Sequence, residues 1–392
     1  MKINSCEQIT LQASYDKNFS TLYHGNKIKP NIYIIIAFCF IFFLIILLIF
    51  STNNKNQNYQ NQNIGIKNKF SLKPIEHNEK EKIFYEKLKL ILDNEEICEN
   101  ELMSKHTTFQ LGGPAKFFIK PNSINKILKV IQLCREFSIE YFILGNGSNL
   151  LVSDQGYNGL VINIKENNFS DLKIKQIDET NYKINVGGGI LMRTLAQRLC
   201  LLSLSGLEDI IDIPGTIGGG IIMNASAGEK GLIYNSLEKV KVITPEGEIK
   251  ELSKKECKLR HRGSFLQDNK YIVIEAIFNL IKTDKMIIQK TMADHTSRRY
   301  SKQPMYFPSA GCFFVWDKPK FGSLYEKYKE SNLVSYKVGD AMIYTYNIAF
   351  IVNLGDAKSS DVYQIVTKVE NIMLSKYKID IKREVVVLGS FS

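Results

Sequence analysis

The sequence has few of the residues that bind metals or form disulfide frameworks. Its 392 residues include 5 His and 7 Cys, and the cysteines are widely spaced with no CxxC pair. Zinc sites need Cys and His ligands at short, regular spacing, and disulfide scaffolds need a dense, even set of cysteines. We therefore expect no metal site, and we expect free thiols in a reducing compartment.

Nucleic-acid-binding motifs are also absent, although the chain is basic. Lys and Arg total 51 against 40 acidic residues, a net charge of +11, with no helix-turn-helix, zinc-finger or RNP pattern. Such a charge suits anionic small ligands, so we expect no nucleic-acid partner. Hydrophobic residues make up 44% of the chain, which excludes a wholly disordered protein, and the length predicts two or three domains. We expect a monomer.

One long hydrophobic run lies near the N-terminus. Residues 32–50 carry no charge, and nineteen helical residues span about 28 Å, close to a bilayer core. We predict a polar tail at 1–30, a transmembrane helix at 31–50 and a flexible Asn/Gln-rich linker at 51–75. The alternatives are a buried core helix and a cleaved signal peptide, but no small-x-small cleavage site follows the run. Lysines on both sides leave the topology open.

From about Ile75 the pattern becomes globular. Helical periodicity predicts helices at 78–96, 122–138, 194–206 and 359–379. Shorter apolar runs bounded by glycine predict strands, with TTFQL and PAKFFI flanking a Gly-Gly turn and VVVLG near the C-terminus. The body is therefore predicted to be a mixed α+β fold.

Three glycine-rich turns follow or precede strands, at 145–149, 187–189 and 214–220. Glycines allow the backbone to approach a phosphate closely and to point several N–H groups at it. Tight turns between strands are the alternative. No P-loop or Rossmann signature occurs, so the turns predict a dinucleotide-sized ligand bound in another way. Neutral donors beside the turns are Ser148, Asn149, Thr216, Asn224 and Ser226.

Three strings in this order resemble the UDP-N-acetylenolpyruvoylglucosamine reductase (MurB) family. They are HTTFQLGGPAKFFIKP, LGNGSNLLVSDQGYNGLVI and GLEDIIDIPGTIGGGIIMNASAGEKG, and the resemblance covers about 80–392. It implies a two-part FAD-binding domain of the vanillyl-alcohol-oxidase type at 76–285, with subdomains at 76–162 and 163–285. It also implies a substrate-binding α+β domain at 286–392.

The resemblance implies an activity as well. NADPH reduces a noncovalently bound FAD, and a UDP-linked enolpyruvyl sugar is then reduced to UDP-N-acetylmuramate for peptidoglycan precursor synthesis. Hydride passes from flavin N5 to the vinyl carbon. We expect a cytoplasmic catalytic body tethered through 31–50. The alternatives are another FAD-dependent oxidoreductase of this fold and a catalytically weak, membrane-tethered flavin-binding module.

The family's FAD-binding motifs carry over to the glycine-rich turns and their neighbours. The implied cofactor-binding residues are Gly145, Asn146, Gly147, Ser148, Asn149, Leu150, Gly206, Pro214, Gly215, Thr216, Gly218, Gly219, Asn224 and Ser226.

Three residues match the family's catalytic motifs. Arg262 in HRGSF is implied to polarise the substrate carboxylate, and Glu384 in REVVVLG to lie beside it. Cys312 in PSAGCFF stands where the family usually has a proton-donating serine. A thiol of ordinary pKa, about 8.5, releases a proton more readily than an alcohol. The alternatives are a surface arginine, an inert core cysteine and a solvated glutamate.

Three basic residues are implied to bind substrate. Arg298 and Arg299 resemble a basic pair suited to a diphosphate, and Lys337 lies near a lysine of the family. The short separation of Arg262 and Cys312 resembles the family's compact type, which lacks an inserted tyrosine-bearing loop. The segment after Cys312, FFVWDKP, departs from the family's Phe-Lys-Asn-Pro, so the substrate domain matches less closely than the FAD domain.

Overall fold

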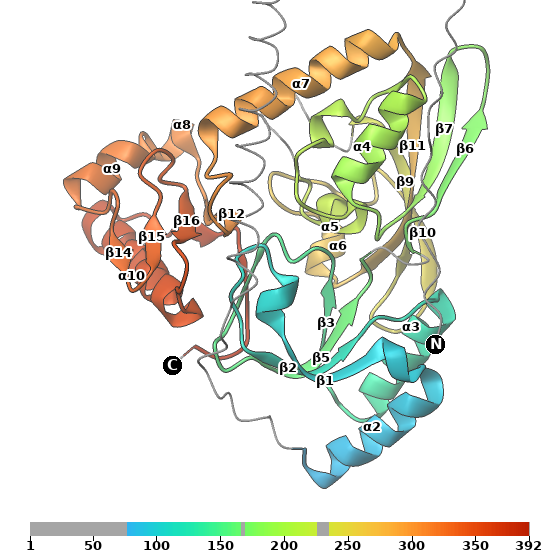
Figure 1. The fold of residues 1–392 in the computed structure, drawn as a ribbon, viewed down its shortest axis with the longest axis horizontal. Helices are drawn as coiled ribbons and strands as arrows, with labels where there is room; N and C mark the ends of the chain where they lie inside the picture. Colours follow the sequence, from blue (N-terminus) through green and yellow to red (C-terminus); the bar gives the residue numbers. More distant parts are fainter. Residues whose placement is uncertain (1–76, 166–168, 226–234, 392) are drawn as a thin grey trace, which may run out of the picture. The chain divides into compact units, whose positions relative to one another are not determined.

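The computed structural model describes residues 77–165, 169–225 and 235–391 (Figure 1). The predicted tail at 1–30, span at 31–50 and linker at 51–75 lie outside the described residues. Among the described residues, no helix is long and apolar enough to cross a membrane. Residues 72–392 form one compact unit, whose described part contains both helices and sheets, so the mixed α and β fold is confirmed.

The first sheet is mixed and has the order β1-β2-β5-β3. Helix α3 packs on it through Ile127, Val130 and Ile131, and its start is capped by the Ser123 hydroxyl. Phe84 and Leu88 of α2 join the same core. The bounds are α2 Glu79–Ile91, β1 Ile97–Leu102, β2 Pro114–Ile119, α3 Ile124–Glu136, β3 Tyr141–Leu144 and β5 Tyr157–Asn163.

The second sheet is antiparallel, with the order β10-β9-β11-β7-β6, and β8 pairs with β11. Leu195 and Leu199 of α4 pack on it, as does Ile217 at the start of α5. The bounds are β6 Leu172–Gln176, β7 Asn181–Gly187, α4 Met192–Leu201, β8 Leu204–Ser205, η4 Glu208–Ile210, α5 Ile217–Ile222, β9 Leu237–Ile243, β10 Ile249–Ser253, α6 Phe265–Asp268 and β11 Ile272–Lys282.

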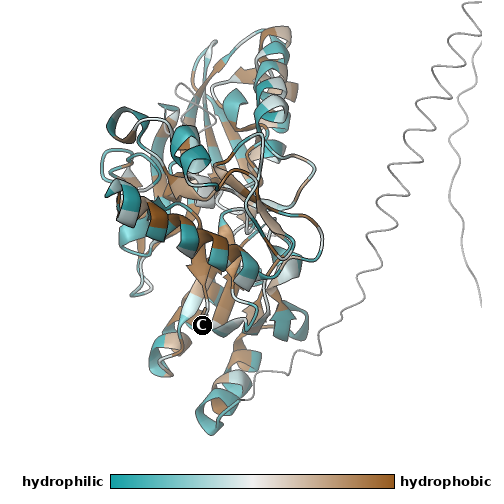
Figure 2. Ribbon diagram, turned by 90° about the vertical axis from the view of Figure 1, so that its left-hand side faces the viewer, coloured by the Kyte–Doolittle hydropathy of each residue, from teal (hydrophilic) through white to brown (hydrophobic). Residues whose placement is uncertain are grey.

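The third sheet, β12-β16-β15-β14, follows the long helix α7, which leads away from β11 (Figure 1). Val362, Ile365 and Val366 of α10 belong to its core. Figure 2 shows hydrophobic residues on the strands and hydrophilic residues along the outer sides of the helices. The bounds are α7 Lys285–Lys302, β12 Ser309–Cys312, α8 Lys318–Phe321, α9 Leu324–Glu330, β14 Lys337–Val338, β15 Ala341–Ile343, β16 Phe350–Asn353 and α10 Ser359–Tyr377.

The end of the chain returns to the strand β4, with which it forms a separate two-stranded sheet. After β13 (Phe314–Val315) pairs with β17 (Lys382–Arg383), the strand β18 (Val386–Leu388) pairs in parallel with β4 (Leu150–Val152). The carboxylate of Asp154 also accepts hydrogen bonds from the backbone N–H groups of Ser359 and Ser360, each at 2.8 Å. Asp154 therefore caps α10 although the two segments lie about 200 residues apart in the sequence.

Three details of the predicted elements are wrong. The segment at 107–111 is a turn instead of a strand, because the Thr107 hydroxyl and carbonyl bond to Leu111 and Gln110. The helix predicted at 78–96 ends at Ile91, and the one predicted to end at Gly206 stops at Leu201, before β8. The helices predicted at 122–138 and 359–379 are confirmed.

Candidate active site

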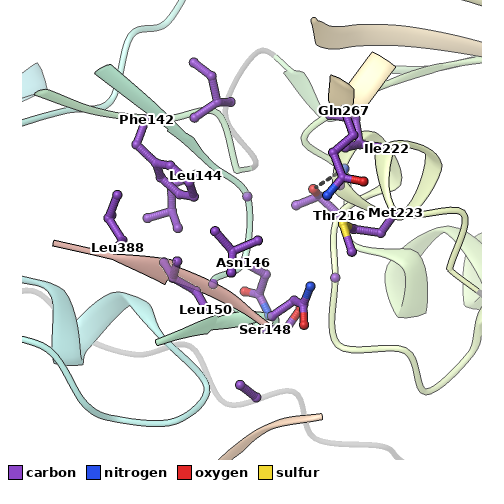
Figure 3. A pocket seen from close by; sticks show the side chains of 18 of the residues that line it. Phe142, Leu144, Asn146, Ser148, Leu150, Thr216, Ile222, Met223, Gln267 and Leu388 are labelled. Atoms are coloured by element: carbon purple, nitrogen blue, oxygen red, sulfur yellow. Dashed lines mark hydrogen bonds between the residues drawn. The ribbon is translucent and has the colours of Figure 1, made fainter. Parts of the chain in front are cut away.

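A cavity of about 1580 Å³ runs along the ends of the first sheet and continues to β12. Its volume exceeds that of a typical small-ligand pocket, about 300–1,000 Å³, so it has room for a dinucleotide and a second ligand. Figure 3 shows Phe142, Leu144 and Leu388 on one side of it and Thr216, Met223 and Gln267 on the other. Segments from all parts of the described chain therefore form its walls.

The turn after β3 presents unused donors to this cavity. Five consecutive backbone N–H groups in this turn donate to no acceptor among the described residues, and all five residues line the cavity. They are Gly145, Asn146, Gly147, Ser148 and Asn149. A Cβ on Gly145 would lie 2.6 Å from the Thr216 hydroxyl oxygen, so the two glycine turns are in direct contact. Consecutive free N–H groups form a site for phosphate oxygens.

The turn at 214–220 contributes a wall and few donors. Thr216 caps α5 by accepting from the N–H of Gly219 at 3.3 Å, and the N–H of Gly218 donates to the carbonyl of Gly188 at 2.8 Å. Its glycines thus allow close packing against neighbouring backbone.

The third turn, at 187–189, does not line the cavity, so its interpretation as a phosphate-binding turn is wrong. Its N–H groups are used inside the protein, Gly188 donating to Ile274 and Gly189 to Phe169, each at 2.8 Å. Here the alternative of a tight turn between strands holds.

An ion pair lies at the far end of the cavity. The Nε of Arg262 is 3.1 Å from Oε1 of Glu384, and the two side chains are 25% and 14% exposed. Glu384 is held through its backbone, since its N–H donates to the carbonyl of Phe313 and its own carbonyl accepts from the Asn149 side chain at 2.9 Å. Burial raises the pKa of Glu384, and Arg262 opposes this shift.

Cys312 ends β12 in the same part of the cavity. Burial raises the pKa of its thiol to about 11; the charge of Glu384 adds to the shift, while Arg262 and Arg299 oppose it. The ordinary thiol pKa expected from the sequence is therefore wrong for Cys312, whose pKa is higher. Cys312 stays protonated at neutral pH and so can donate a proton beside a guanidinium group.

Arg299 brings a second cation to this region from α7. Its Nε is buried and has no hydrogen-bond partner among the described residues. Burial lowers the pKa of its guanidinium. A buried guanidinium with an unused donor is suited to an anionic ligand group.

Comparison with known proteins places these features in a family. The FAD binding domain family matches residues 115–253, and the C-terminal domain of UDP-N-acetylenolpyruvoylglucosamine reductase matches 303–388. The reductase of Clostridium novyi is 37% identical over 306 residues, 78% of this chain and 96% of that protein. The chain belongs to the UDP-N-acetylenolpyruvoylglucosamine reductase family. The reductase of Carboxydothermus hydrogenoformans is 35% identical over 294 residues, 75% of this chain and 94% of that protein.

A solved reductase structure of this family has the same fold. The enzyme from Thermus caldophilus superposes with a TM-score of 0.62 at 30% identity, covering 74% of this chain and 98% of that one. The match covers nearly the whole of the solved enzyme, so the described fold is the family fold.

The cavity fits the FAD that the matched domain family binds. The free N–H groups at 145–149 can receive phosphate oxygens, and Phe142, Leu144 and Met223 supply an apolar wall suited to aromatic rings. The Asn146 side chain is fixed by its bond to the carbonyl of Pro214 at 2.8 Å. We therefore take 145–149 and the wall at 214–216 as the segments that hold the dinucleotide.

Most of the residues predicted from the reductase family motifs line this cavity. They are Gly145, Asn146, Gly147, Ser148, Asn149, Leu150, Pro214, Gly215, Thr216, Gly219, Arg262, Arg299, Cys312 and Glu384.

Three predicted cofactor residues do not line it. Gly206 lies after β8, where an added Cβ would meet Leu280 and Ser236. Gly218 packs against backbone, as described above. Asn224 donates its side-chain amide to the carbonyl of Arg260 at 2.9 Å and thus supports the loop that carries Arg262. Ser226 lies outside the described residues.

Two predicted substrate-binding residues also lie outside the cavity lining. Arg298 is exposed on α7, where its guanidinium bonds to the carbonyl of Asp294 and approaches His295. Lys337 is exposed and pairs with Asp340 at 3.1 Å. Both side chains are exposed and have partners of their own.

Much of the apolar lining of the cavity has no signal in the sequence. Phe142 and Leu144 belong to a strand that was predicted, but their direction toward a ligand was not. Leu388 reaches the cavity only through the parallel pairing of β18 with β4, which joins distant segments. Alternating hydrophobicity marks a strand and gives no signal for which side faces a cavity.

Proposed function

We infer that this protein is an FAD-dependent reductase that uses NADPH to reduce UDP-N-acetylenolpyruvoylglucosamine to UDP-N-acetylmuramate, the activity for which its family is named. One observation carries the inference: a single cavity holds both the free N–H groups at 145–149 and the Arg262, Cys312 and Glu384 cluster. The N–H groups can bind a dinucleotide, and the side-chain cluster can stabilise negative charge and donate a proton.

The side chains have separable roles in this reaction. FAD bound in this cavity would supply the terminal vinyl carbon of the sugar with a hydride that originates from NADPH. The electron pair of the double bond then moves toward the neighbouring carbon and its carboxylate, where Arg262 stabilises the charge. Cys312 donates its proton to that carbon and is left as a thiolate, which solvent reprotonates. Glu384 keeps the guanidinium of Arg262 in place through their ion pair.

On the substrate side, Arg299 is the residue we propose for an anionic group of the UDP-sugar. Arg299 lines the cavity, and its buried Nε has no hydrogen-bond partner among the described residues. Arg298 and Lys337 face solvent with partners of their own, so we assign them no contact in the cavity.

We also propose where the protein works and how its body is divided. UDP-sugars and NADPH are cytoplasmic, so the catalytic body belongs in the cytoplasm. We propose in addition that the body is a monomer and that it is tethered through 31–50. The separation of the sheets supports domain boundaries near 162 and 285. A protease-protection assay on membranes tests the cytoplasmic placement, because cleavage of the body only from the extracytoplasmic side would refute it.

The test of the activity uses the visible spectrum. Purified protein should carry a noncovalent yellow flavin that anaerobic NADPH bleaches, and the enolpyruvyl sugar should restore the colour with one equivalent of product. A flavin that bleaches but is not reoxidised by the sugar would favour the weak flavin-binding module. A different oxidoreductase of this fold would reoxidise with another substrate and leave the sugar unchanged.

A further inference from the structure

A buried carboxylate outside the cavity joins the segment after η4 to the helices α4 and α7. Asp212 lies between η4 and the turn at 214–220, and its side chain is 5% exposed. Its Oδ1 pairs with Arg193 of α4 at 2.5 Å, and its Oδ2 accepts from the Thr296 hydroxyl of α7 at 2.5 Å. Both carboxylate oxygens are therefore used, each by a different helix.

Thr296 lies on the same face of α7 as Arg299. Residues three apart on a helix are neighbours on its surface, so a bond that fixes α7 at Thr296 also fixes the point from which the Arg299 side chain extends. Arg299 lines the cavity and leaves its buried Nε unpartnered, as described above. The negative charge of Asp212 acts on its guanidinium and opposes the lowering of its pKa by burial. Asp212 thus holds the helix and also supplies countercharge to the cation that the helix carries.

We propose that Asp212 is a positioning residue that, through Thr296, holds α7 so that Arg299 faces the anionic part of the substrate. This inference rests on the proposed function and deepens it, because it names what determines affinity for the UDP-sugar. A guanidinium whose direction is set before binding binds an anion more tightly, because the free-energy cost of ordering the side chain is not paid on association. The Asp212–Thr296 bond supplies that order from the FAD-binding side of the molecule.

Thr296→Val tests the bond with little change in side-chain volume. We expect KM for the enolpyruvyl sugar to rise roughly five- to tenfold, the effect of losing one hydrogen bond of average strength, with kcat within about twofold. Thr296→Ser restores the hydroxyl and should restore KM. Thr291→Val is the matched control, because Thr291 lies on the same helix and bonds only to the carbonyl of Ile287. Melting temperature and FAD content are measured for each variant.

A double-mutant cycle shows whether the effect passes through Arg299. In an Arg299→Ala background, Thr296→Val should raise KM no further, because the residue it positions is absent. Asp212→Asn is the second variant, should Thr296→Val fail to fold, and it should raise KM in the same way. An unchanged KM in a folded variant, or additive effects in the cycle, would overturn the inference. Wild-type protein that binds FAD but leaves the sugar unreduced would instead refute the proposed function, and with it this role.

Discussion

The Nε of Arg262 lies 3.1 Å from Oε1 of Glu384, joining the loop after β10 to the segment that follows β17. Arg262 has a left-handed backbone with φ of +55°, a conformation that costs a non-glycine residue free energy. Such strain persists where surrounding contacts hold it, and it is frequent at functional sites. The support comes from Asn224, whose amide holds the carbonyl of Arg260 at 2.9 Å.

Replacement of Glu384 by Gln should change the pH dependence of stability. Burial raises the pKa of this carboxyl above its ordinary value, so its contribution to stability is present at acid pH and is lost as pH rises through the raised pKa. We therefore expect the melting temperature of Glu384→Gln, minus that of the wild type, to increase from pH 4 to pH 8. Scanning calorimetry measures it, with exposed Glu179→Gln as the control. A difference independent of pH would contradict the raised pKa.

Cys312→Ala should separate the two half-reactions. Flavin reduction by NADPH needs no proton from Cys312 and should stay near the wild-type rate, while reduction of the enolpyruvyl sugar should slow by roughly 10²–10⁴. Cys312→Ser keeps a proton donor and should retain much of the rate. Stopped-flow absorbance of the flavin follows both steps. Equal losses in the two half-reactions would show that Cys312 is not the proton donor.

Removing the cap that Asp154 provides to α10 should destabilise the protein. Asp154→Ala leaves the N–H groups of Ser359 and Ser360 without their carboxylate, which costs about 1–2 kcal/mol for a typical helix cap. The melting temperature should fall by several degrees, as about 2–4 °C per kcal/mol is expected for a body of this size. Asp380→Ala, which removes an exposed pair with Lys382, should change it little. Equal effects of the two substitutions would refute the capping role.

The residues that sequence could place in the site are those with a local signature. The turn at 145–149 was predicted because glycines and small polar residues directly follow an apolar strand. Arg262, Cys312 and Glu384 were found through family motifs, and the structure brings them to one end of one cavity. Their mutual distance depends on the pairing of β13 with β17, which no local pattern reports.

Other features depend on contacts that sequence leaves undetermined. The glycines at 187–189 have the composition of a phosphate-binding turn, but their N–H groups donate to Ile274 and Phe169. Composition shows that a backbone can approach a ligand, and only the fold shows whether its donors are already used. The role of Asp212 could not be predicted from the sequence either, because its two partners lie on other elements, α4 and α7.

The unused donors of the turn after β3 make Gly147 a sharp test of FAD binding. Gly147 has φ of +62°, and a Cβ there would lie 2.0 Å from the carbonyl oxygen of His106, so Gly147→Ala must displace backbone. The left-handed conformation alone costs alanine about 1–2 kcal/mol. If the turn shifts to avoid this cost, its N–H groups move away from the phosphates, and a loss of the same free energy from binding would weaken FAD affinity roughly tenfold. The clash adds to this, so we expect purified Gly147→Ala to have lost most of its flavin absorbance.

Gly247→Ala is the matched control for this substitution. Gly247 also has a positive φ, +87°, in the turn between β9 and β10, but nothing lies within 4 Å of an added Cβ. This variant should lose about 1 kcal/mol of stability and keep its FAD. Titration of the apoprotein with FAD, followed by flavin fluorescence, compares the two dissociation constants. If Gly147→Ala and Gly247→Ala bind FAD equally well, the N–H groups at 145–149 are not the phosphate site.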